Sequence, residues 1–185
     1  METQQRAAKL TILLGTNGTG KSTLLRNIIT RCNQRTLIVT PDAAEWNDYP
    51  ENPLERKSDY LFTGIQKHVY NPQTSLDAVS KFVKGTLVMD DFRAFGLSLV
   101  DERIHSLFIR RRQRELDIFF AAHGFREVPP VAFSFATDIF LFRTCDNIDV
   151  RRKDLNNFDE IKKLQAQVNA EAAKNPHYYQ YYKWS

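Results

Sequence analysis

Short apolar runs alternate along the chain with segments whose apolar residues recur at helical spacing. The first run covers residues 9–14, and from Lys21 to about Cys32 leucines and isoleucines form one face of a predicted helix. Further strand-like runs cover residues 36–40, 85–90, 116–122 and 138–143. Because alternating strands and helices are typical of α/β folds, we expect a mainly parallel central sheet of about five strands, flanked by helices.

The remaining segments complete this picture. Helical periodicity predicts helices over residues 75–83, 97–114 and 158–174. Residues 41–58 contain three prolines and many polar groups, which indicates a long functional or mobile excursion from the sheet. The aromatic tail, residues 177–184, is expected to pack on the sheet as an edge strand or lid, and stacking on nucleic-acid bases is the alternative. We expect one domain, with a core over about 9–145 and an extension over 146–185.

Composition and charge narrow the class of protein. A chain of 185 residues with 42% hydrophobic and 26% charged residues is typical of a soluble globular domain. The net charge of +4 is compatible with nucleic acid as a partner without requiring it. No apolar stretch is long enough to span a bilayer, and no secretory leader is visible, so we expect an intracellular protein. The two cysteines, Cys32 and Cys145, are predicted to be buried, reduced thiols, and the four histidines lack metal-ligand spacing.

The motif with the most chemical content follows the first apolar run. Residues Gly15-Thr-Asn-Gly-Thr-Gly-Lys-Ser-Thr23 match G-x-x-x-x-G-K-[ST], the phosphate-binding loop, in its expected context between a strand and a helix. Glycines let consecutive N–H groups turn toward a polyphosphate, and the helix N-terminus adds its positive dipole end. Lys21 can reach the β- and γ-phosphates, and the Ser22 hydroxyl can ligate Mg²⁺. The chain is therefore predicted to bind a nucleoside triphosphate. The residues expected to contact it are Gly15, Thr16, Asn17, Gly18, Thr19, Gly20, Lys21, Ser22 and Thr23.

Two carboxylates end the strand-like run at residues 85–90. Mg²⁺ on a nucleotide needs a carboxylate at a strand tip near the phosphate loop, and Asp90 suits that role. Asp91 can orient and deprotonate a water that attacks the γ-phosphate, although a solvated pair of aspartates in a turn is the alternative. The sequence has neither the N-K-x-D motif of small GTPases nor the L-S-G-G-Q signature of transporter-type ATPases.

His123 follows the run at residues 116–122. In P-loop ATPases with a strand between the phosphate-loop strand and the acidic strand, the tip of that strand faces the γ-phosphate and often carries a polar sensor. His123 fits this role by its position, and a partly exposed loop histidine is the alternative.

The densest basic cluster is Arg110-Arg-Arg-Gln-Arg114. Arg110 or Arg112 can act as an arginine finger on a neighbouring subunit, or the cluster can contact DNA phosphates in a central pore. A solvated basic face is the third interpretation. Arg111 falls within the apolar stripe of the predicted helix, so either the helix ends there or Arg111 is buried with a partner.

With these residues in place, the chain resembles the HerA–FtsK superfamily of DNA-translocating ATPases. It looks most like the small genome-packaging ATPases of membrane-containing, double-jelly-roll viruses. The resemblance covers roughly residues 9–145 and depends on the phosphate loop, the strand ending at Asp91, and the block from Ile109 to His123. That family typically has a glutamine where this chain has His123, and often Asp-Glu where this chain has Asp90-Asp91.

The resemblance implies a RecA/FtsK-like P-loop fold and an ATP-hydrolysing motor that uses ATP and Mg²⁺ to move double-stranded DNA, most plausibly into a viral capsid. It implies a homo-oligomeric ring, commonly hexameric, located in the host cytoplasm or at the packaging vertex of a virion, with a capsid or portal-vertex protein as a partner. Pore-facing loops, for example residues 92–96, would contact the DNA. Three alternatives stay open: a filamentous-phage morphogenesis ATPase, a small-molecule P-loop kinase and a nucleotide-binding regulator without chemistry.

Overall fold

A computed structural model of the chain describes residues 8–91 and 102–184. These residues form a seven-stranded sheet in the spatial order β3-β2-β4-β5-β1-β6-β7. The first six strands in the chain run parallel to their neighbours, and β7 pairs antiparallel with β6. The strands are β1 (Leu10–Leu14), β2 (Thr36–Thr40), β3 (Ile65–Val69), β4 (Gly85–Met89), β5 (Leu116–Ala122), β6 (Asp138–Phe142) and β7 (Tyr179–Lys183). The prediction of a mainly parallel α/β sheet is confirmed.

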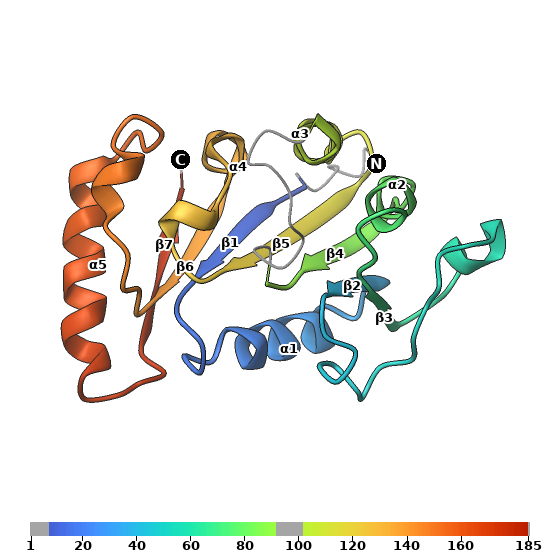
Figure 1. Cartoon of the computed structure of the whole chain (residues 1–185), viewed down its shortest axis with the longest axis horizontal. Helices are drawn as coiled ribbons and strands as arrows, with labels where there is room; N and C mark the ends of the chain where they lie inside the picture. Colours follow the sequence, from blue (N-terminus) through green and yellow to red (C-terminus); the bar gives the residue numbers. More distant parts are fainter. Residues whose placement is uncertain (1–7, 92–101, 185) are drawn as a thin grey trace, which may run out of the picture.

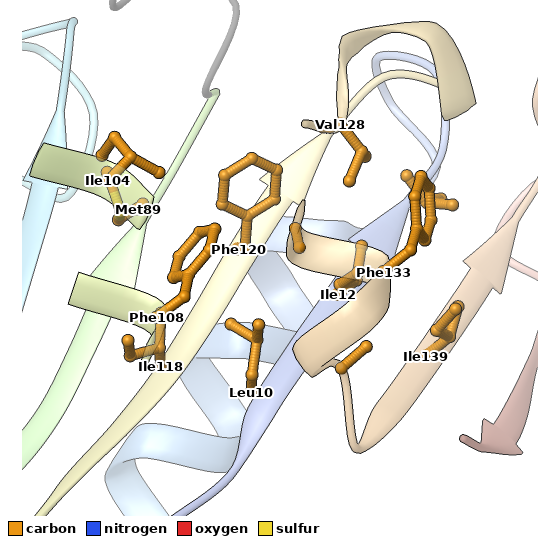
Figure 2. Packing of buried hydrophobic residues seen from close by; sticks show 14 of the residues in the cluster. Leu10, Ile12, Met89, Ile104, Phe108, Ile118, Phe120, Val128, Phe133 and Ile139 are labelled. Atoms are coloured by element: carbon orange, nitrogen blue, oxygen red, sulfur yellow. The ribbon is translucent and has the colours of Figure 1, made fainter. Parts of the chain in front are cut away.

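Helices cover both faces of this sheet (Figure 1). They are α1 (Lys21–Cys32), α2 (Ser75–Val79), α3 (Glu102–Arg110), α4 (Pro130–Phe135) and α5 (Phe158–Ala172), with short 3-10 turns at Lys57–Tyr60, Phe125–Glu127 and Ile148–Arg151. Helix α1 lies on one face, where Leu25 and Ile29 pack on Leu13 of β1. Helices α2, α3 and α4 lie on the other face, over Leu10 and Ile12 of the same strand (Figures 1 and 2). Because successive β1 side chains point into two different apolar cores, the sequence of this strand is a nearly continuous apolar run.

Two of the seven strands lie outside the five predicted from apolar runs. Strand β7 is formed by the aromatic tail, which confirms the expected edge strand. Strand β3 was not predicted because its sequence, Ile65-Gln-Lys-His-Val69, is largely polar. Its polar side chains are nevertheless buried with partners. The Lys67 ammonium donates to the Ala43 carbonyl at 2.7 Å, and the His68 imidazole lies 2.7 Å from the Ser75 hydroxyl.

Helix α3 ends four residues before the predicted boundary, and Arg111 shows why. Its guanidinium turns inward and donates to the carbonyls of Phe108, at 2.8 Å, and Phe135, at 3.1 Å. The sequence predicted that either the helix ends at Arg111 or this side chain is buried with a partner. Both are observed, because α3 ends at Arg110 and the Arg111 side chain is buried. Helices α2 and α5 are shorter than predicted at their C-terminal ends.

The prediction that both cysteines are buried is wrong. Cys32 occupies the last position of α1 and Cys145 follows β6, and both are exposed. Their apolar sequence neighbours suggested burial, but each cysteine lies on the solvent side of its segment. Within residues 8–91 and 102–184, no helix is long and apolar enough to cross a membrane.

The packing between β5 and α3 makes a direct prediction about stability. Phe120 of the central strand is fully buried, and its ring meets that of Phe108 edge-on at 5.9 Å between centroids (Figure 2). Phe120→Ala is expected to lower the free energy of unfolding by about 3–5 kcal/mol, because it removes apolar contacts and leaves a cavity. Urea unfolding followed by circular dichroism measures this loss. Ile109→Ala, at a side chain of α3 that is 45% exposed, is the control and should change it by less than about 0.5 kcal/mol. Equal effects of the two substitutions would contradict the assigned core.

Candidate nucleotide-binding site

The phosphate loop leaves β1 at the carboxyl edge of the sheet. It is tied to the neighbouring strands, because Gly15 N donates to the Ala122 carbonyl at 3.1 Å and Thr16 N to the Arg143 carbonyl at 2.9 Å. A Cβ at Gly15 would lie 2.5 Å from Cβ of Phe142, so only glycine fits there. Gly20 has a φ of 99°, in the left-handed region, and directly precedes α1. The predicted freedom of the backbone is therefore used at Gly20, whereas glycine is needed at Gly15 for close packing, which the sequence did not predict.

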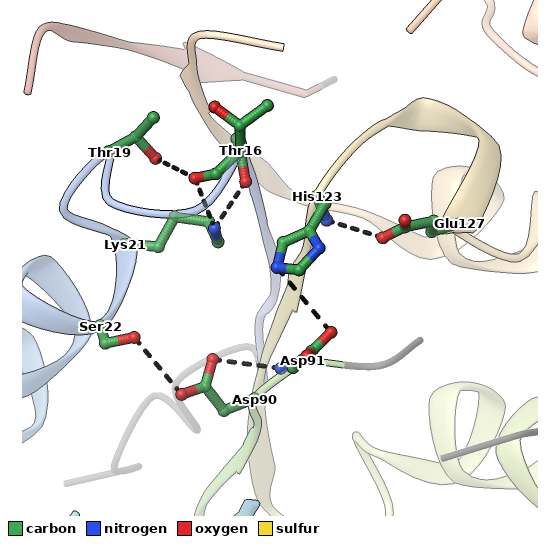
Figure 3. Close-up of polar contacts among 9 residues, drawn as sticks. Thr16, Thr19, Lys21, Ser22, Asp90, Asp91, His123 and Glu127 are labelled. Carbon is green, nitrogen blue, oxygen red and sulfur yellow. Dashed lines mark hydrogen bonds and ion pairs between the residues drawn. The ribbon is translucent and has the colours of Figure 1, made fainter. Parts of the chain in front are cut away.

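Lys21 projects from the first turn of α1 into the loop (Figure 3). Its ammonium donates to the carbonyl of Gly15 at 2.5 Å and to that of Thr16 at 3.1 Å. Burial lowers the pKa of Lys21, while the nearby carboxylates of Asp90 and Asp91 act in the opposite direction. The loop thus presents a positive charge held among backbone carbonyls, a position from which it can turn to an anionic ligand.

Asp90 faces Lys21 from the end of β4. Its Oδ2 accepts from the Ser22 hydroxyl at 3.4 Å and from the Trp46 indole N–H at 2.8 Å. Burial raises the pKa of Asp90, and the indole hydrogen bond and the charge of Lys21 partly offset that shift. The pair of a hydroxyl and a carboxylate supplies hard oxygen donors of the kind that Mg²⁺ on a nucleotide uses. Because such an ion takes most of its ligands from phosphates and water, two protein oxygens are enough. In the described parts of the chain, no group of three or more metal-binding side chains is found.

Asp91 and His123 come together beside this pair. His123 lies just past β5, the strand between β1 and β4, as the sequence predicted. Its Nε2 lies 3.9 Å from Oδ1 of Asp91, and its backbone N–H donates to the Glu127 carboxylate at 2.9 Å (Figure 3). Asp91 itself has a left-handed backbone, with φ of 49°. This conformation places consecutive aspartates in different directions, one toward Ser22 and the other toward His123.

These groups line one polar pocket of about 410 Å³. Its lining comprises residues 17–23, Glu45, Asp90, Asp91, His123 and His177. The structure therefore gathers residues 17–23 of the predicted phosphate loop, the acidic pair and the histidine around a single space large enough for a triphosphate, whereas Gly15 and Thr16 of the predicted set do not line it.

Four residues at or behind the pocket were missed by sequence reasoning: Glu45, Trp46, Glu127 and His177. Glu45 and Trp46 belong to the excursion over residues 41–58, which was expected to be functional or mobile without any residue being named. Desolvation together with the carboxylates of Asp90 and Asp42 raises the pKa of Glu45. The one sequence signal was the unusual length of that segment, because no motif marks residues that reach a site from distant loops.

Arg110 and Arg112 do not join this pocket. Both are exposed, and they lie where α3 ends and β5 begins. Leu116 N donates to the Arg111 carbonyl and Gly85 N to the Glu115 carbonyl, which places this turn at the amino edge of the parallel strands. The pocket lies at the opposite, carboxyl edge. Neither arginine can therefore contact a nucleotide bound to its own chain. The proposed pore loop, residues 92–96, lies outside the described residues.

Comparison with known proteins adds to this geometry. Among solved structures, the genome packaging NTPase B204 from Sulfolobus turreted icosahedral virus 2, in complex with sulfate, matches with a TM-score of 0.65 and 16% identity, over 96% of this chain and 92% of that chain. The same NTPase in complex with ATP-gammaS matches with a TM-score of 0.64 and 16% identity, over 96% and 93% of the two chains. The N-terminal domain of zonular occludens toxin from Neisseria meningitidis matches with a TM-score of 0.54 and 11% identity, over 97% and 95%. The resemblance to the packaging ATPases is thus confirmed in the fold.

Sequence comparison gives one match. A search of curated protein sequences finds no significant relative. The family model described as ABC transporter matches residues 1–129, which include the phosphate loop, Asp90, Asp91 and His123. The match does not depend on the L-S-G-G-Q signature, which the sequence lacks. Because it covers well over half of the chain and contains the phosphate loop with both strand tips that face it, this protein belongs to the ABC transporter family of P-loop ATPases.

Proposed function

We propose that the protein is an ATP-driven motor that moves double-stranded DNA into a viral capsid. The observation that carries the proposal is the extent of the likeness to the viral DNA-packaging ATPase B204, which covers nearly the whole of both chains. Because the likeness covers 96% of this chain, it extends well beyond residues 1–129, the segment that the family match covers. Under this proposal the protein works in the host cytoplasm or at the packaging vertex of a virion, with a capsid or portal-vertex protein as its partner.

The proposed chemistry begins with phosphate binding. Backbone N–H groups of residues 15–23 and the N-terminus of α1 hold the phosphates of ATP. Lys21 exchanges its contacts with the Gly15 and Thr16 carbonyls for the β- and γ-phosphates. Ser22 and Asp90 would hold Mg²⁺, which neutralises charge on the phosphates during transfer. The indole N–H of Trp46 donates to Oδ2 of Asp90 and the backbone N–H of Asp91 donates to Oδ1, and together they fix the orientation of this carboxylate.

The second carboxylate, Asp91, is the proposed general base for hydrolysis. Asp91 accepts a proton from the attacking water, and His123 lies against its Oδ1, where it can orient that carboxylate and respond to the γ-phosphate. Glu127 holds the backbone of His123 in place. Water as the acceptor distinguishes this arrangement from a small-molecule kinase, which would need an acceptor site next to the γ-phosphate.

Arginine is supplied by a neighbouring copy in this proposal. Arg110 and Arg112 are exposed at the edge opposite the pocket, so a ring in which one copy's arginine edge meets the next copy's pocket would complete the site.

The first test is steady-state ATP hydrolysis by the purified protein with and without double-stranded DNA. We expect DNA to stimulate hydrolysis, and the apparent affinity for DNA to fall by about tenfold or more between 50 and 200 mM salt, because the contacts are to phosphates. Lys21→Ala should abolish hydrolysis in every condition. Lys174→Ala, at an exposed lysine paired with Glu171 on α5, is the matched control and should behave as the unmodified protein. A rate of hydrolysis that does not change when DNA is added, or hydrolysis that starts only when a small acceptor molecule is added, would refute the proposed motor function.

Asp91→Asn is expected to separate binding from turnover. The amide keeps the size of the side chain but cannot accept the proton, so kcat should fall by about 10²–10⁴-fold while the Kd for ATP stays within about twofold. Single-turnover hydrolysis and isothermal titration calorimetry measure the two quantities. Asp159→Asn, at an exposed aspartate of α5, should change neither. If Asp91→Asn weakens ATP binding as much as turnover, the residue holds the nucleotide and is not the base.

Mixing variants tests the shared site. Arg110→Ala or Arg112→Ala subunits keep an intact pocket, and Lys21→Ala subunits keep intact arginines. A mixture of Lys21→Ala subunits with either arginine variant should therefore regain part of the ATPase activity, which each variant lacks on its own. Mixtures of Lys21→Ala with Asp91→Asn form the matched control, because both lesions lie in the same pocket and no combination restores it. Absence of recovery at every ratio, for both arginines, would exclude an arginine supplied in trans.

A further inference from the structure

The geometry points to a nucleoside subsite built by the C-terminal strand β7 and the start of α1, with Tyr179 as the platform on which the nucleobase stacks. The inference rests on the proposed function only in taking a nucleoside triphosphate as the ligand. It assigns a binding role to the aromatic tail. From the sequence, this tail was expected to be an edge strand or lid, with stacking on nucleic-acid bases as the alternative.

A second pocket adjoins the phosphate pocket. Its volume is about 340 Å³, and its lining is Thr19, Gly20, Thr23, Leu24, Asn27, Phe142, His177 and Tyr179. Thr19, Gly20, Thr23 and His177 line both pockets, so the two spaces meet along the phosphate loop. The second pocket has none of the residues that face the γ-phosphate end, namely Asp90, Asp91 and His123.

The orientation of a bound triphosphate follows from this division. Lys21 would serve the β- and γ-phosphates, and Ser22 and Asp90 would hold the Mg²⁺ that neutralises their charge, so the terminal phosphate would lie toward β4 and β5. The α-phosphate and the nucleoside must then leave at the other end of the loop. That end is the shared boundary at Gly20 and Thr23, which opens into the second pocket.

The second pocket has the chemistry that a nucleobase requires. Tyr179 is 40% exposed, and its ring packs on Phe142 at 4.9 Å and on Phe140 at 5.9 Å between centroids, so the aromatic residue is supported by neighbouring rings and still partly open to solvent. Every base has a π-face that can stack on such a ring. Leu24 adds an apolar wall, and Asn27 brings an amide with both donor and acceptor groups within the lining.

His177 marks the boundary between the two pockets. A Cβ at Gly20 would lie 3.4 Å from its Nδ1, so the imidazole covers the loop backbone at the left-handed glycine. Its own backbone N–H donates to the Asn175 side chain at 3.0 Å. The residue is exposed and lines both pockets, where the ribose and α-phosphate would pass between them.

The space on the other side of the loop is less suitable for a base. It is lined by Ser22, Arg26 and residues 44–48. Its aromatic residue, Trp46, is 2% exposed, and the guanidinium of Arg26 covers the indole at 4.8 Å while it pairs with Asp48. No open aromatic face is available among these lining residues, which leaves the β7 side for the base.

The experiment compares a ligand that has a base with one that has none. Isothermal titration calorimetry of the full chain with ATP and with inorganic tripolyphosphate measures both affinities. Tyr179→Ala should weaken ATP binding by at least about tenfold and change tripolyphosphate binding by less than about twofold. Tyr179→Phe keeps the ring and should retain ATP affinity. If Tyr179→Ala disturbs β7, as thermal unfolding would reveal, Tyr179→Leu keeps apolar volume without an aromatic face and carries the same expectation.

Tyr181→Ala is the matched control. Tyr181 lies two residues along the same strand, is 51% exposed and also packs on Phe140, but it does not line either pocket along the phosphate loop. Its substitution should leave both affinities unchanged. Unchanged ATP affinity in Tyr179→Ala and Tyr179→Leu, or equal losses for ATP and tripolyphosphate, would overturn the inference. A protein that binds ATP through Tyr179 but is not stimulated by DNA would refute the motor and leave the subsite standing.

Discussion

The parallel pairing of β4, β5 and β1 is the constraint on which the site depends. Because the three strands run in the same direction and in adjacent positions, the residues that follow them emerge together at one edge of the sheet. The phosphate loop follows β1, the acidic pair follows β4 and His123 follows β5. Ligand sites at the carboxyl ends of parallel strands are general in open α/β sheets. Here apolar cores pack on both sides of β1, so the strand that carries the phosphate loop is anchored on both faces.

Burial gives the polar groups at that edge their properties. Lys21 and Asp90 are both buried. Burial lowers the pKa of Lys21 and raises the pKa of Asp90, which favours the neutral form of each, while the opposite charge of each residue shifts the pKa of the other in the opposite direction. A charge kept in such a place is costly unless it is compensated by hydrogen bonds or an opposite charge. The carbonyls of the loop compensate Lys21, and the hydroxyl of Ser22 and the indole of Trp46 compensate Asp90. An incoming phosphate and cation would replace part of this compensation with stronger partners, which is why a preformed site can favour the charged ligand.

The sequence predicted this edge well because it is encoded locally. A glycine loop between a strand and a helix, and carboxylates directly after an apolar strand, are signals within a few residues. The missed parts are those whose burial depends on distant partners. Strand β3 is polar, and it is stable in the sheet because residues 43–52 and Ser75 satisfy Lys67 and His68. Likewise, Glu45 and His177 reach the pocket from loops whose course no periodicity indicates. Cys32 and Cys145 show the opposite error, since apolar neighbours along the chain do not determine which side of a segment faces the core.

The distribution of groups over the molecule also limits how copies of the chain can cooperate. The pocket lies at the carboxyl edge of the sheet, and Arg110 and Arg112 lie at the amino edge. In a two-fold dimer the same patch meets itself, so both groups would have to lie within one self-complementary patch that spans the sheet from one edge to the other. A head-to-tail contact, in which one copy's amino edge meets the next copy's carboxyl edge, would bring an arginine to a neighbour's nucleotide without such a patch. Until such a chain of copies closes, each of its two terminal copies keeps one unused edge. Closure into a ring is what would make every pocket equivalent, and an open filament would leave one terminal pocket without its arginine.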